Sequence, residues 1–387
     1  MIMTEEQLTA FCKHLLNAQL PQLVPLAIER YRSRTQPISI DLLKLLVWAY
    51  RELGDYAKAA EVQPYILRAI PGDIGEQYNY ADLLLALGRY EIGWKKYFYR
   101  YQMEHTKKIA RHVTLGQRWN GQPIKGRRLY LFDEQGLGDT IQFIRFILLA
   151  QQVSEAEVFV EVTDALYEII KRSFPTLHII RRRDQLEHWD YYCELMNLPL
   201  ALGTTLETIP APQGYLTAAP ERLAYWRNRL EALGPTRKIA LVWAGNPSFS
   251  ADAIRSPHIT PYNLLPSDPR LQYLSVQKGY AEQEYLLSSL NIHSLSAEIS
   301  DFDDTAAILL NCDLFITSDT SPAHLAGALG VPTWVALPFL ADWRWLRDRT
   351  DSPWYSTLRL YRQSAARSWN EVFTHIQQDI TREFLTS

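Results

Sequence analysis

The stretch that most constrains the fold runs from Leu129 to Thr140, where a glycine turn separates an apolar run from an amphipathic segment. The first four residues are typical of a buried strand, and apolar residues recur at helical spacing after Thr140. Gly136 and Gly138 allow a tight turn and a close approach of a ligand to the main chain. This strand–turn–helix pattern predicts an open α/β sheet, which binds ligands beyond the carboxyl ends of its strands.

Asp139 follows the two glycines and opens the expected helix. In the simpler interpretation it caps the helix, because acidic side chains are favoured at a helix N-terminus. In the alternative interpretation its carboxylate lies where open α/β sheets place their ligands.

Composition excludes several classes of protein. A chain of 387 residues with 47% apolar residues suggests two or three domains with full cores. The formal net charge of -3 argues against a nucleic-acid partner. Cys12, Cys193 and Cys312 are too few for a disulfide framework or a zinc site and fit a reducing compartment. The N-terminus lacks the features of a signal peptide, and no apolar run approaches the ~18 residues of a membrane span. These observations predict a cytoplasmic protein.

The first hundred residues predict an all-α region with an internal repeat. Leu53-Gly54-Asp55-Tyr56 recurs as Leu87-Gly88-Arg89-Tyr90, with a period of 34 residues. A Gly-x-Tyr turn between two helices at this period is the tetratricopeptide signature. The glycine supplies a left-handed turn, and the tyrosine packs between the helices. A third, degenerate copy is expected over 5–30, and chance similarity is the alternative explanation.

After Arg100, short apolar runs alternate with helical stretches, which is the pattern of a parallel sheet. The pattern is interrupted by an irregular stretch, Asp190–Thr204, and by Pro210 and Pro212, which are typical of a linker. The alternation of apolar runs and helical stretches then resumes after these prolines. Two such units predict two Rossmann-like domains, and the amphipathic segment after Trp369 predicts a last helix that crosses back toward the first of them. The expected strands are Leu129–Phe132, Val158–Val162, His178–Ile180, Ile239–Trp243, Tyr273–Val276, Leu314–Ile316 and Thr333–Leu337.

A second strand-to-helix turn lies near the C-terminus. A buried run leads to an acid, Asp319, and the hydroxyl residues Thr320 and Ser321 are suited to cap the helix that follows. Pro322 is tolerated in a first helical turn. The predicted helix N-terminus suits a diphosphate, and His324 lies one turn inside it. An ordinary capped helix with a packed histidine is the alternative interpretation.

These two turns resemble those of a known family. Asp319-Thr320-Ser321-Pro322-Ala323-His324 resembles the Asp-Thr-x-x-x-His stretch of heptosyltransferase-like glycosyltransferases of the GT-B fold, and Glu134–Thr140 resembles their Gly-x-Gly-Asp turn. Val242–Pro247, Asp342–Trp345 and Asp351–Tyr355 are similar to segments of bacterial proteins that fuse tetratricopeptide repeats to such a domain. The same plan occurs in O-linked N-acetylglucosamine transferases. The chain departs from heptosyltransferases in its repeats and in its tryptophan-rich C-terminal segment.

The resemblance implies an α/β chain of the GT-B fold. It implies tetratricopeptide-like helices over 1–108, an acceptor-side Rossmann-like domain over 125–212, a nucleotide-sugar-binding Rossmann-like domain over 213–365 and a last helix over 366–387. It also implies inverting transfer of a hexosyl or heptosyl group from a nucleotide-diphosphate sugar to a protein or glycan acceptor. No metal or other cofactor is expected, and the repeats are expected to bind the acceptor or a partner.

The expected site residues come from the two turns and the loops near them. Asp139 is expected to be the catalytic base. Arg255 is expected to cover the phosphates, since its planar guanidinium group can donate two hydrogen bonds to a phosphate. In the alternative interpretation it is a solvated loop arginine. The acceptor-side loop comprises Glu134, Gln135, Gly136 and Gly138, and the nucleotide sugar is expected to contact Asn246, Arg255, Gln277, Lys278, Asp319, Thr320, Ser321, Pro322, Ala323 and His324.

Asp301-Phe302-Asp303 mimics the Asp-x-Asp metal motif of other glycosyltransferases. It precedes a helical stretch rather than following a strand, so we interpret it as a helix cap and expect no metal. Two other functions stay open. One is a non-catalytic tetratricopeptide interaction scaffold with a degenerate GT-B module. The other is a nucleotide-sugar epimerase, which predicts no helical repeats.

Overall fold

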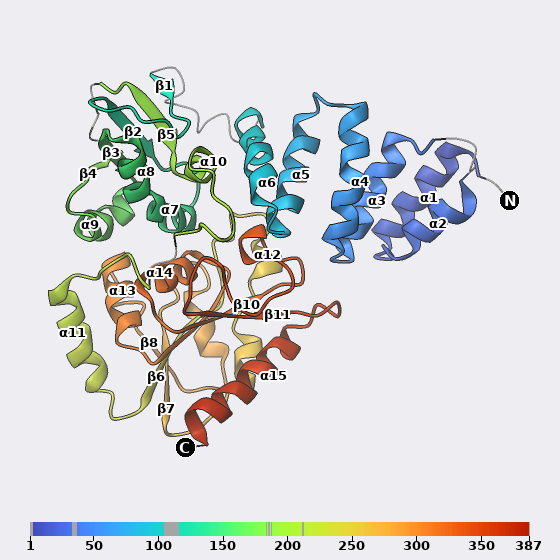
Figure 1. Ribbon diagram of the computed structural model, residues 1–387. Helices are drawn as coiled ribbons and strands as arrows, with labels where there is room; N and C mark the ends of the chain where they lie inside the picture. Colours follow the sequence, from blue (N-terminus) through green and yellow to red (C-terminus); the bar gives the residue numbers. More distant parts are fainter. Residues whose placement is uncertain are drawn as a thin grey trace. The chain divides into compact units, whose positions relative to one another are not determined.

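The computed structural model describes residues 3–32, 37–103, 116–182, 184, 186, 188–210 and 213–386. Their contacts group the chain into two compact units. The first unit holds the N-terminal helices together with Phe339–Arg347, and the second unit holds both β-sheets (Figure 1). Residues 108 and 212, where two predicted domains end, lie outside the described residues, so these boundaries remain predictions.

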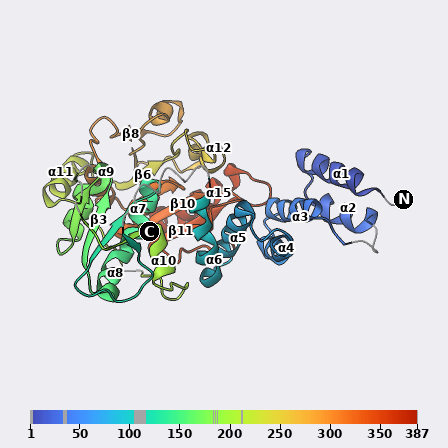
Figure 2. The same ribbon diagram turned by 90° about the horizontal axis from the view of Figure 1, so that it is seen from above.

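Three successive helical hairpins are described in the first unit. Helices α5 and α6 start 34 residues after α3 and α4, at Ile74 rather than Ile40 and at Tyr90 rather than Tyr56. The hairpins α3–α4 and α5–α6 lie side by side in the turned view of Figure 2. The helices are α1 (Glu5–Asn17), α2 (Leu23–Tyr31), α3 (Ile40–Glu52), α4 (Tyr56–Ala69), α5 (Ile74–Ala86) and α6 (Tyr90–Tyr97).

Local sequence explains how these hairpins turn. Gly54 and Gly88 lie between the two helices of their hairpins with φ angles of 75° and 72°, in the left-handed region that glycine adopts without strain. The Asp55 carboxylate accepts a hydrogen bond from Lys58 N–H at 3.0 Å and so caps α4. The helical region and its 34-residue period, both predicted from the sequence, are therefore present.

The first sheet has five parallel strands in the order β1-β5-β2-β3-β4. Its strand β2 is apolar and buried along four of its five residues, as expected for a strand covered on both faces. The strands are β1 (Gln117–Arg118), β2 (Arg128–Phe132), β3 (Glu157–Val162), β4 (His178–Arg181) and β5 (Tyr191–Glu194), and the helices between them include α7 (Leu137–Phe143), α8 (Ile147–Ser154) and α9 (Asp164–Ser173), with α10 (Leu198–Ala201) after β5.

The second sheet has six parallel strands in the order β11-β10-β9-β6-β7-β8. The strands β9 and β10 are fully buried along their lengths and mostly apolar, as expected for strands covered on both faces. The strands are β6 (Arg237–Val242), β7 (Leu271–Ser275), β8 (Ile292–Ser294), β9 (Leu314–Ser318), β10 (Thr333–Leu337) and β11 (Leu358–Arg362), and the helices are α11 (Pro220–Glu231), α12 (Asp252–Arg255), α13 (Phe302–Leu310), α14 (Ser321–Leu329) and α15 (Trp369–Ile380).

The predicted fold class is confirmed: an all-α region precedes two parallel Rossmann-like sheets, the plan of a GT-B chain. All seven expected strands are present. The interpretation of Asp190–Thr204 as irregular was wrong, because this stretch contains β5 and the helix α10. The strand Tyr-Tyr-Cys-Glu is short and does not alternate, so it carries little pattern of its own.

The last helix does not pack where the sequence analysis expected it. Its buried residues Val372, Phe373, Ile376 and Ile380 belong to the core of the second sheet. Figure 1 shows α15 beside β11, on the second sheet. The expected crossing toward the first sheet is therefore corrected, and the physical reason is the apolar face that α15 buries against its own domain.

The helices of the described part of the chain are short. The longest, α4, has 14 residues. None of the described helices combines the length and the apolar character that a membrane span requires.

Candidate functional site

Each sheet has a switch point, where successive strands are added on opposite sides of one central strand. In the first sheet β3 and β4 lie on one side of β2, and β5 lies on the other. In the second sheet β7 and β8 lie on one side of β6, and β9 and β10 lie on the other. Ligands of open α/β sheets bind at such points, beyond the carboxyl ends of the strands. The segments Glu134–Asp139, Asn246–Arg255 and Asp319–His324 come shortly after the ends of β2, β6 and β9, so all three lie at switch points.

The turn after β2 places Asp139 at the start of α7. Gly136 is the N-cap residue, and the Asp139 carboxylate accepts a hydrogen bond from its N–H at 2.8 Å. This is the capping contact that the simpler interpretation of Asp139 predicted. Glu134 is buried behind the turn, whereas Gln135 is exposed. The neighbouring acid Asp133 is structural, since its carboxylate pairs with Arg182 at 2.6 Å.

The turn after β9 forms the N-terminus of α14. Thr320 is the N-cap residue, Pro322 lies in the first turn, and the following small residues pack the helix against the sheet. The Thr320 hydroxyl lies 3.4 Å from the Ser318 carbonyl oxygen rather than bonding to the first turn. His324 is buried, and its Nδ1 lies 2.9 Å from the Tyr355 hydroxyl. Ala323 is buried, while Asp319 keeps only a small exposed fraction.

Gly138 lies against His324, so the two predicted turns meet. A β-carbon built on Gly138 would lie 2.8 Å from His324 Cδ2 and 3.4 Å from Ser321 Cα. Any side chain at this position would displace the histidine, and glycine is therefore required by packing rather than by backbone conformation. The contact joins two segments that the sequence analysis identified independently.

Tyr355 supports His324 from the opposite side. Its ring packs over Gly327, where a β-carbon would collide with it. Burial raises the pKa of Tyr355 well above its usual range, and the nearby Tyr215 hydroxyl adds to the effect while the Arg145 cation opposes it. Tyr355 therefore stays protonated at neutral pH, and its hydroxyl proton can be donated to Nδ1 of the histidine.

Arg145 connects the two sheets beside this pair. It lies in the short 3-10 turn Ile144–Phe146 after α7 and is buried. Its guanidinium donates to the Pro210 carbonyl at 3.0 Å, to the Tyr215 hydroxyl at 3.0 Å and to the Trp354 carbonyl. The same group lies 4.5 Å from the centre of the Tyr355 ring. Carbonyl oxygens and aromatic faces thus stabilise this buried cation.

The loop after β6 folds back on itself around Arg255. The Arg255 side chain pairs with Asp252 at 3.1 Å and lies 4.6 Å from the centre of the Phe249 ring. A β-carbon on Gly245 would lie 2.6 Å from Arg255 Nη2, so the guanidinium lies directly over the backbone at the end of β6. Asn246 is exposed in this loop and closes a local turn.

Gln277 has a structural role in this structure. Its Oε1 accepts from the N–H groups of Trp243 and Ala244, both at 3.0 Å. Its Nε2 donates to the carbonyls of Ala244 at 3.0 Å and Lys278 at 2.9 Å. These bonds use the hydrogen-bonding capacity of the amide to clamp the ends of β6 and β7, and the contact of Gln277 with the nucleotide stays a prediction. Lys278 is exposed, and its Nζ donates to the Ser296 carbonyl at 2.7 Å.

The Asp-x-Asp stretch forms a helix start, as predicted. The Asp301 carboxylate accepts from Asp304 N–H at 3.0 Å and caps α13. Asp303 pairs with Arg172 of α9. Among the described residues, no group of three or more His, Cys, Asp or Glu side chains is arranged to hold a metal ion.

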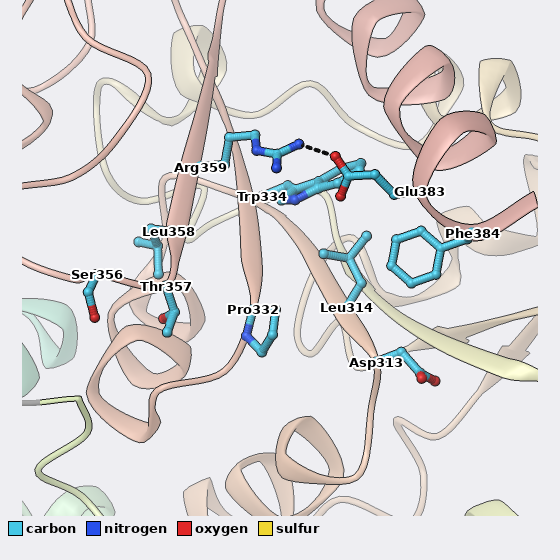
Figure 3. A pocket seen from close by; sticks show the side chains of 10 residues that line it. All are labelled: Asp313, Leu314, Pro332, Trp334, Ser356, Thr357, Leu358, Arg359, Glu383 and Phe384. Atoms are coloured by element: carbon cyan, nitrogen blue, oxygen red, sulfur yellow. Dashed lines mark hydrogen bonds and ion pairs between the residues drawn. The ribbon is translucent and has the colours of Figure 1, made fainter. Parts of the chain in front are cut away.

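A cavity of about 270 Å³ lies away from these segments. Figure 3 shows it at the amino ends of β9, β10 and β11, with Trp334, Arg359, Glu383 and Phe384 around it. Arg359 and Glu383 form an ion pair across it at 2.7 Å. Because the switch point faces the opposite edge of the sheet, this cavity is separate from the candidate site.

Comparison with known proteins gives distant similarities. No protein-family model matches this chain. Protein FlbA of Caulobacter vibrioides is 28% identical over 341 residues, which cover 80% of this chain and 55% of that protein. The chain therefore spans about half the length of the curated relative that it matches.

The chain is also similar to solved glycosyltransferase structures. Heptosyltransferase II of E. coli is 15% identical with a TM-score of 0.46, covering 66% of this chain and 97% of that one. A family 9 glycosyltransferase from Veillonella parvula is 12% identical with a TM-score of 0.42, covering 69% and 91%. An O-GlcNAc transferase mutant from Thermobaculum terrenum is 13% identical with a TM-score of 0.32, covering 99% and 92%. Because these TM-scores are below 0.5, the fold given above rests on the strands and helices of this chain alone.

Two residues of the site were not identified from the sequence. Tyr355 belongs to a segment that carried the family resemblance, but that resemblance assigned it no role. Arg145 carried a weak signal, because it is a lone cation in the apolar run Ile144-Arg145-Phe146-Ile147-Leu148. Such a residue is costly to bury and therefore indicates specific partners. The partners themselves come from other elements, so the sequence pattern could not name them.

Proposed function

We propose that this chain is an inverting, metal-independent glycosyltransferase that moves a hexosyl or heptosyl group from a nucleoside-diphosphate sugar to a protein or glycan acceptor. The contact between Gly138 and His324 at the two switch points carries the proposal. It brings a helix N-terminus that suits a diphosphate beside a turn that holds a carboxylate. Glycosyl transfer needs both groups, one to stabilise the leaving diphosphate and one to accept the proton of the acceptor hydroxyl.

The donor side of the proposal uses the N-terminus of α14. Its backbone N–H groups and dipole favour an anion at this edge of the sheet. His324 is held by Tyr355 through Nδ1, which orients Nε2 toward the turn that contains Gly138. Arg255 follows the adjacent strand and is assigned to the phosphates. Together these groups stabilise the charge of the leaving group without a metal ion.

The acceptor side of the proposal uses Asp139 as the general base. The hydrogen bond from Gly136 N–H holds one carboxylate oxygen, which fixes the orientation of the group. A carboxylate offers about four acceptor positions, so this bond is compatible with proton transfer at the other oxygen. The bond equally suits a helix cap, and an experiment must separate the two roles.

The donor assignment is tested by measuring the melting temperature of the full chain against a panel of nucleoside diphosphates and their sugars. A ligand at ~100 times its dissociation constant stabilises the folded chain by about 2.7 kcal/mol. We expect one nucleotide class to raise the melting temperature and Thr320→Val to reduce that rise. A panel without any stabilising nucleotide would contradict the proposal and favour a non-catalytic scaffold.

The base assignment is tested by Asp139→Asn. Asparagine keeps the volume and caps a helix about as well as aspartate. Loss of a general base should lower turnover by ~10²–10⁴, with nucleotide affinity and melting temperature unchanged. Transfer at the parental rate would leave Asp139 as a cap only.

We also propose that the helical hairpins are tetratricopeptide repeats that bind a protein, and that the chain acts in the cytoplasm. The 34-residue spacing of the helices and the left-handed turns at Gly54 and Gly88 support the first proposal. The three cysteines, all free thiols, support the second.

A further inference from the structure

One segment of the second sheet's connections belongs to the helical unit. The connection from β10 to β11 leaves the sheet after Leu337 and runs through Phe339–Arg347, which groups with the N-terminal helices. It then returns through Trp354 and Tyr355, and Tyr355 holds His324. The helical unit therefore includes a segment that comes from the connection between two strands of the second sheet.

Trp343 is the centre of this intramolecular contact. Its ring lies 5.4 Å from the Trp94 ring and 5.7 Å from the Tyr97 ring, measured between ring centres, with edge-to-face geometry in both cases. All three rings are almost fully buried. Aromatic rings of this size dominate the energetics of interfaces, and edge-to-face pairs add to the stabilisation that burial gives.

Arg347 forms a second contact at the turn of the first 34-residue hairpin. Its guanidinium lies 4.6 Å from the centre of the Tyr56 ring and donates to the Phe339 carbonyl at 2.8 Å. A β-carbon on Gly54 would lie 2.8 Å from Arg347 Nη2 and 2.8 Å from Phe339 Cζ. Gly54, which turns the hairpin, is therefore also in close contact with the segment.

Charged side chains of both the helices and the segment also lie at this contact. Asp82 of α5 pairs with Arg51 at 2.6 Å. Burial raises the pKa of Asp82, Arg51 lowers it, and the segment's Asp342 and Arg344 act on it in opposite directions. Asp342 in turn accepts from Arg344 Nη1 at 2.8 Å. The segment thus presents a tryptophan with arginines to a surface of aromatic rings and one acid.

We propose that Gly54, Tyr56, Trp94 and Tyr97 form a peptide-binding surface for aromatic–basic segments, with Phe339–Arg347 as its internal ligand. A partner protein carrying a segment of the same chemistry competes for this surface. Tethering gives the internal ligand an effective concentration in the millimolar range. A competing segment must therefore bind tightly, or the release of the internal ligand must cost little free energy. The assignment concerns the repeats and holds whether or not the chain transfers sugar.

The test uses the full chain and a synthetic nonapeptide with the natural sequence of Phe339–Arg347. In the Trp343→Ala chain the internal ligand is weakened, and the peptide should bind at least about tenfold more tightly than it binds the unaltered chain. A peptide that itself carries Trp343→Ala should bind neither chain. Trp48→Ala is the matched control, because it removes a half-exposed tryptophan of α3 outside the surface and should behave as the unaltered chain.

Equal binding to both chains, or binding to neither while circular dichroism shows the variant folded, would overturn the proposal. If Trp343→Ala does not fold, Gly54→Ala replaces it. We then expect faster amide exchange in Phe339–Arg347 than in Gly126→Ala, a control with the same left-handed strain (φ 73°) and no neighbouring heavy atom within 4 Å. Equal exchange in the two alanine variants would also overturn the proposal.

Discussion

Gly138 of the first sheet's helix α7 and His324 of the second sheet's helix α14 are in van der Waals contact, with room for a hydrogen atom but not for a methyl group. Each residue belongs to a turn at the switch point of its own sheet. The contact therefore sets how closely the proposed acceptor turn approaches the proposed donor helix.

Replacing Gly138 with alanine should disturb the site more than the fold. The added methyl group must move His324, and overpacking of this kind costs about 1–3 kcal/mol. A displacement of about 1 Å is enough to lower turnover by ~10²-fold. Gly72→Ala is the control, since a β-carbon there meets no heavy atom within 4 Å. Parental turnover in Gly138→Ala would show that the contact does not shape the reaction.

Replacing Arg255 with alanine should weaken nucleotide binding by roughly 1–3 kcal/mol, the range for a lost charge-assisted hydrogen bond. Calorimetry with the best nucleotide of the panel measures the change. Arg237→Ala is the matched control, because Arg237 pairs with Asp313 at 2.8 Å at the amino end of the same strand β6. If both variants bind as the parent does, Arg255 only stabilises its own loop.

Alkaline unfolding should report the burial of Tyr355. Its folded-state pKa lies well above the value of about 10 that it has when unfolded. Between these values the folded chain keeps a proton that the unfolded chain loses, so stability is full below pH ~10 and declines as pH rises. One such group contributes a slope of about 1.4 kcal/mol per pH unit.

In denaturant titrations above pH ~10, the free energy of unfolding of the Tyr355→Phe chain should fall less steeply with pH, by the contribution of one proton. Tyr280→Phe is the control, because Tyr280 is 83% exposed. An unchanged slope in Tyr355→Phe would mean that this hydroxyl ionises equally in both states.

Nucleotide binding should be the same with and without excess EDTA. The Asp301 carboxylate is committed to capping α13, and Asp303 is paired with Arg172. Asp301→Asn should also leave affinity unchanged, since asparagine caps well. Binding that disappears in EDTA and returns with Mg²⁺ or Mn²⁺ would instead make these acids metal ligands.

Much of the fold could be predicted because buried parallel strands and repeated hairpins have local patterns. Thr333–Leu337 was expected as a strand and is β10 in the structure, since a strand covered on both faces is rich in apolar residues. β5 was missed because it is four residues long and ends in the buried acid Glu194. Short strands of this kind are held by their neighbours, and their own sequence carries little information.

The candidate site likewise has parts that could be predicted from the sequence and parts that could not. The turns at Asp139 and Thr320 could be predicted, because glycines, caps and apolar runs mark a strand-to-helix turn. The contact of Gly138 with His324 and the bond of Tyr355 to His324 depend on how the two sheets pack. Gln277 was assigned to the ligand from its place after a strand, and only its hydrogen bonds reveal the clamp.

The segment Phe339–Arg347 also has a consequence for how the chain is made. A ribosome adds about 5–20 residues per second, so Trp343 emerges on the order of tens of seconds after Trp94 and Tyr97. During that interval the newly made helices show an aromatic face whose natural cover does not yet exist. The packing around Trp94 and Tyr97 is therefore completed only after the C-terminal part of the chain has been made.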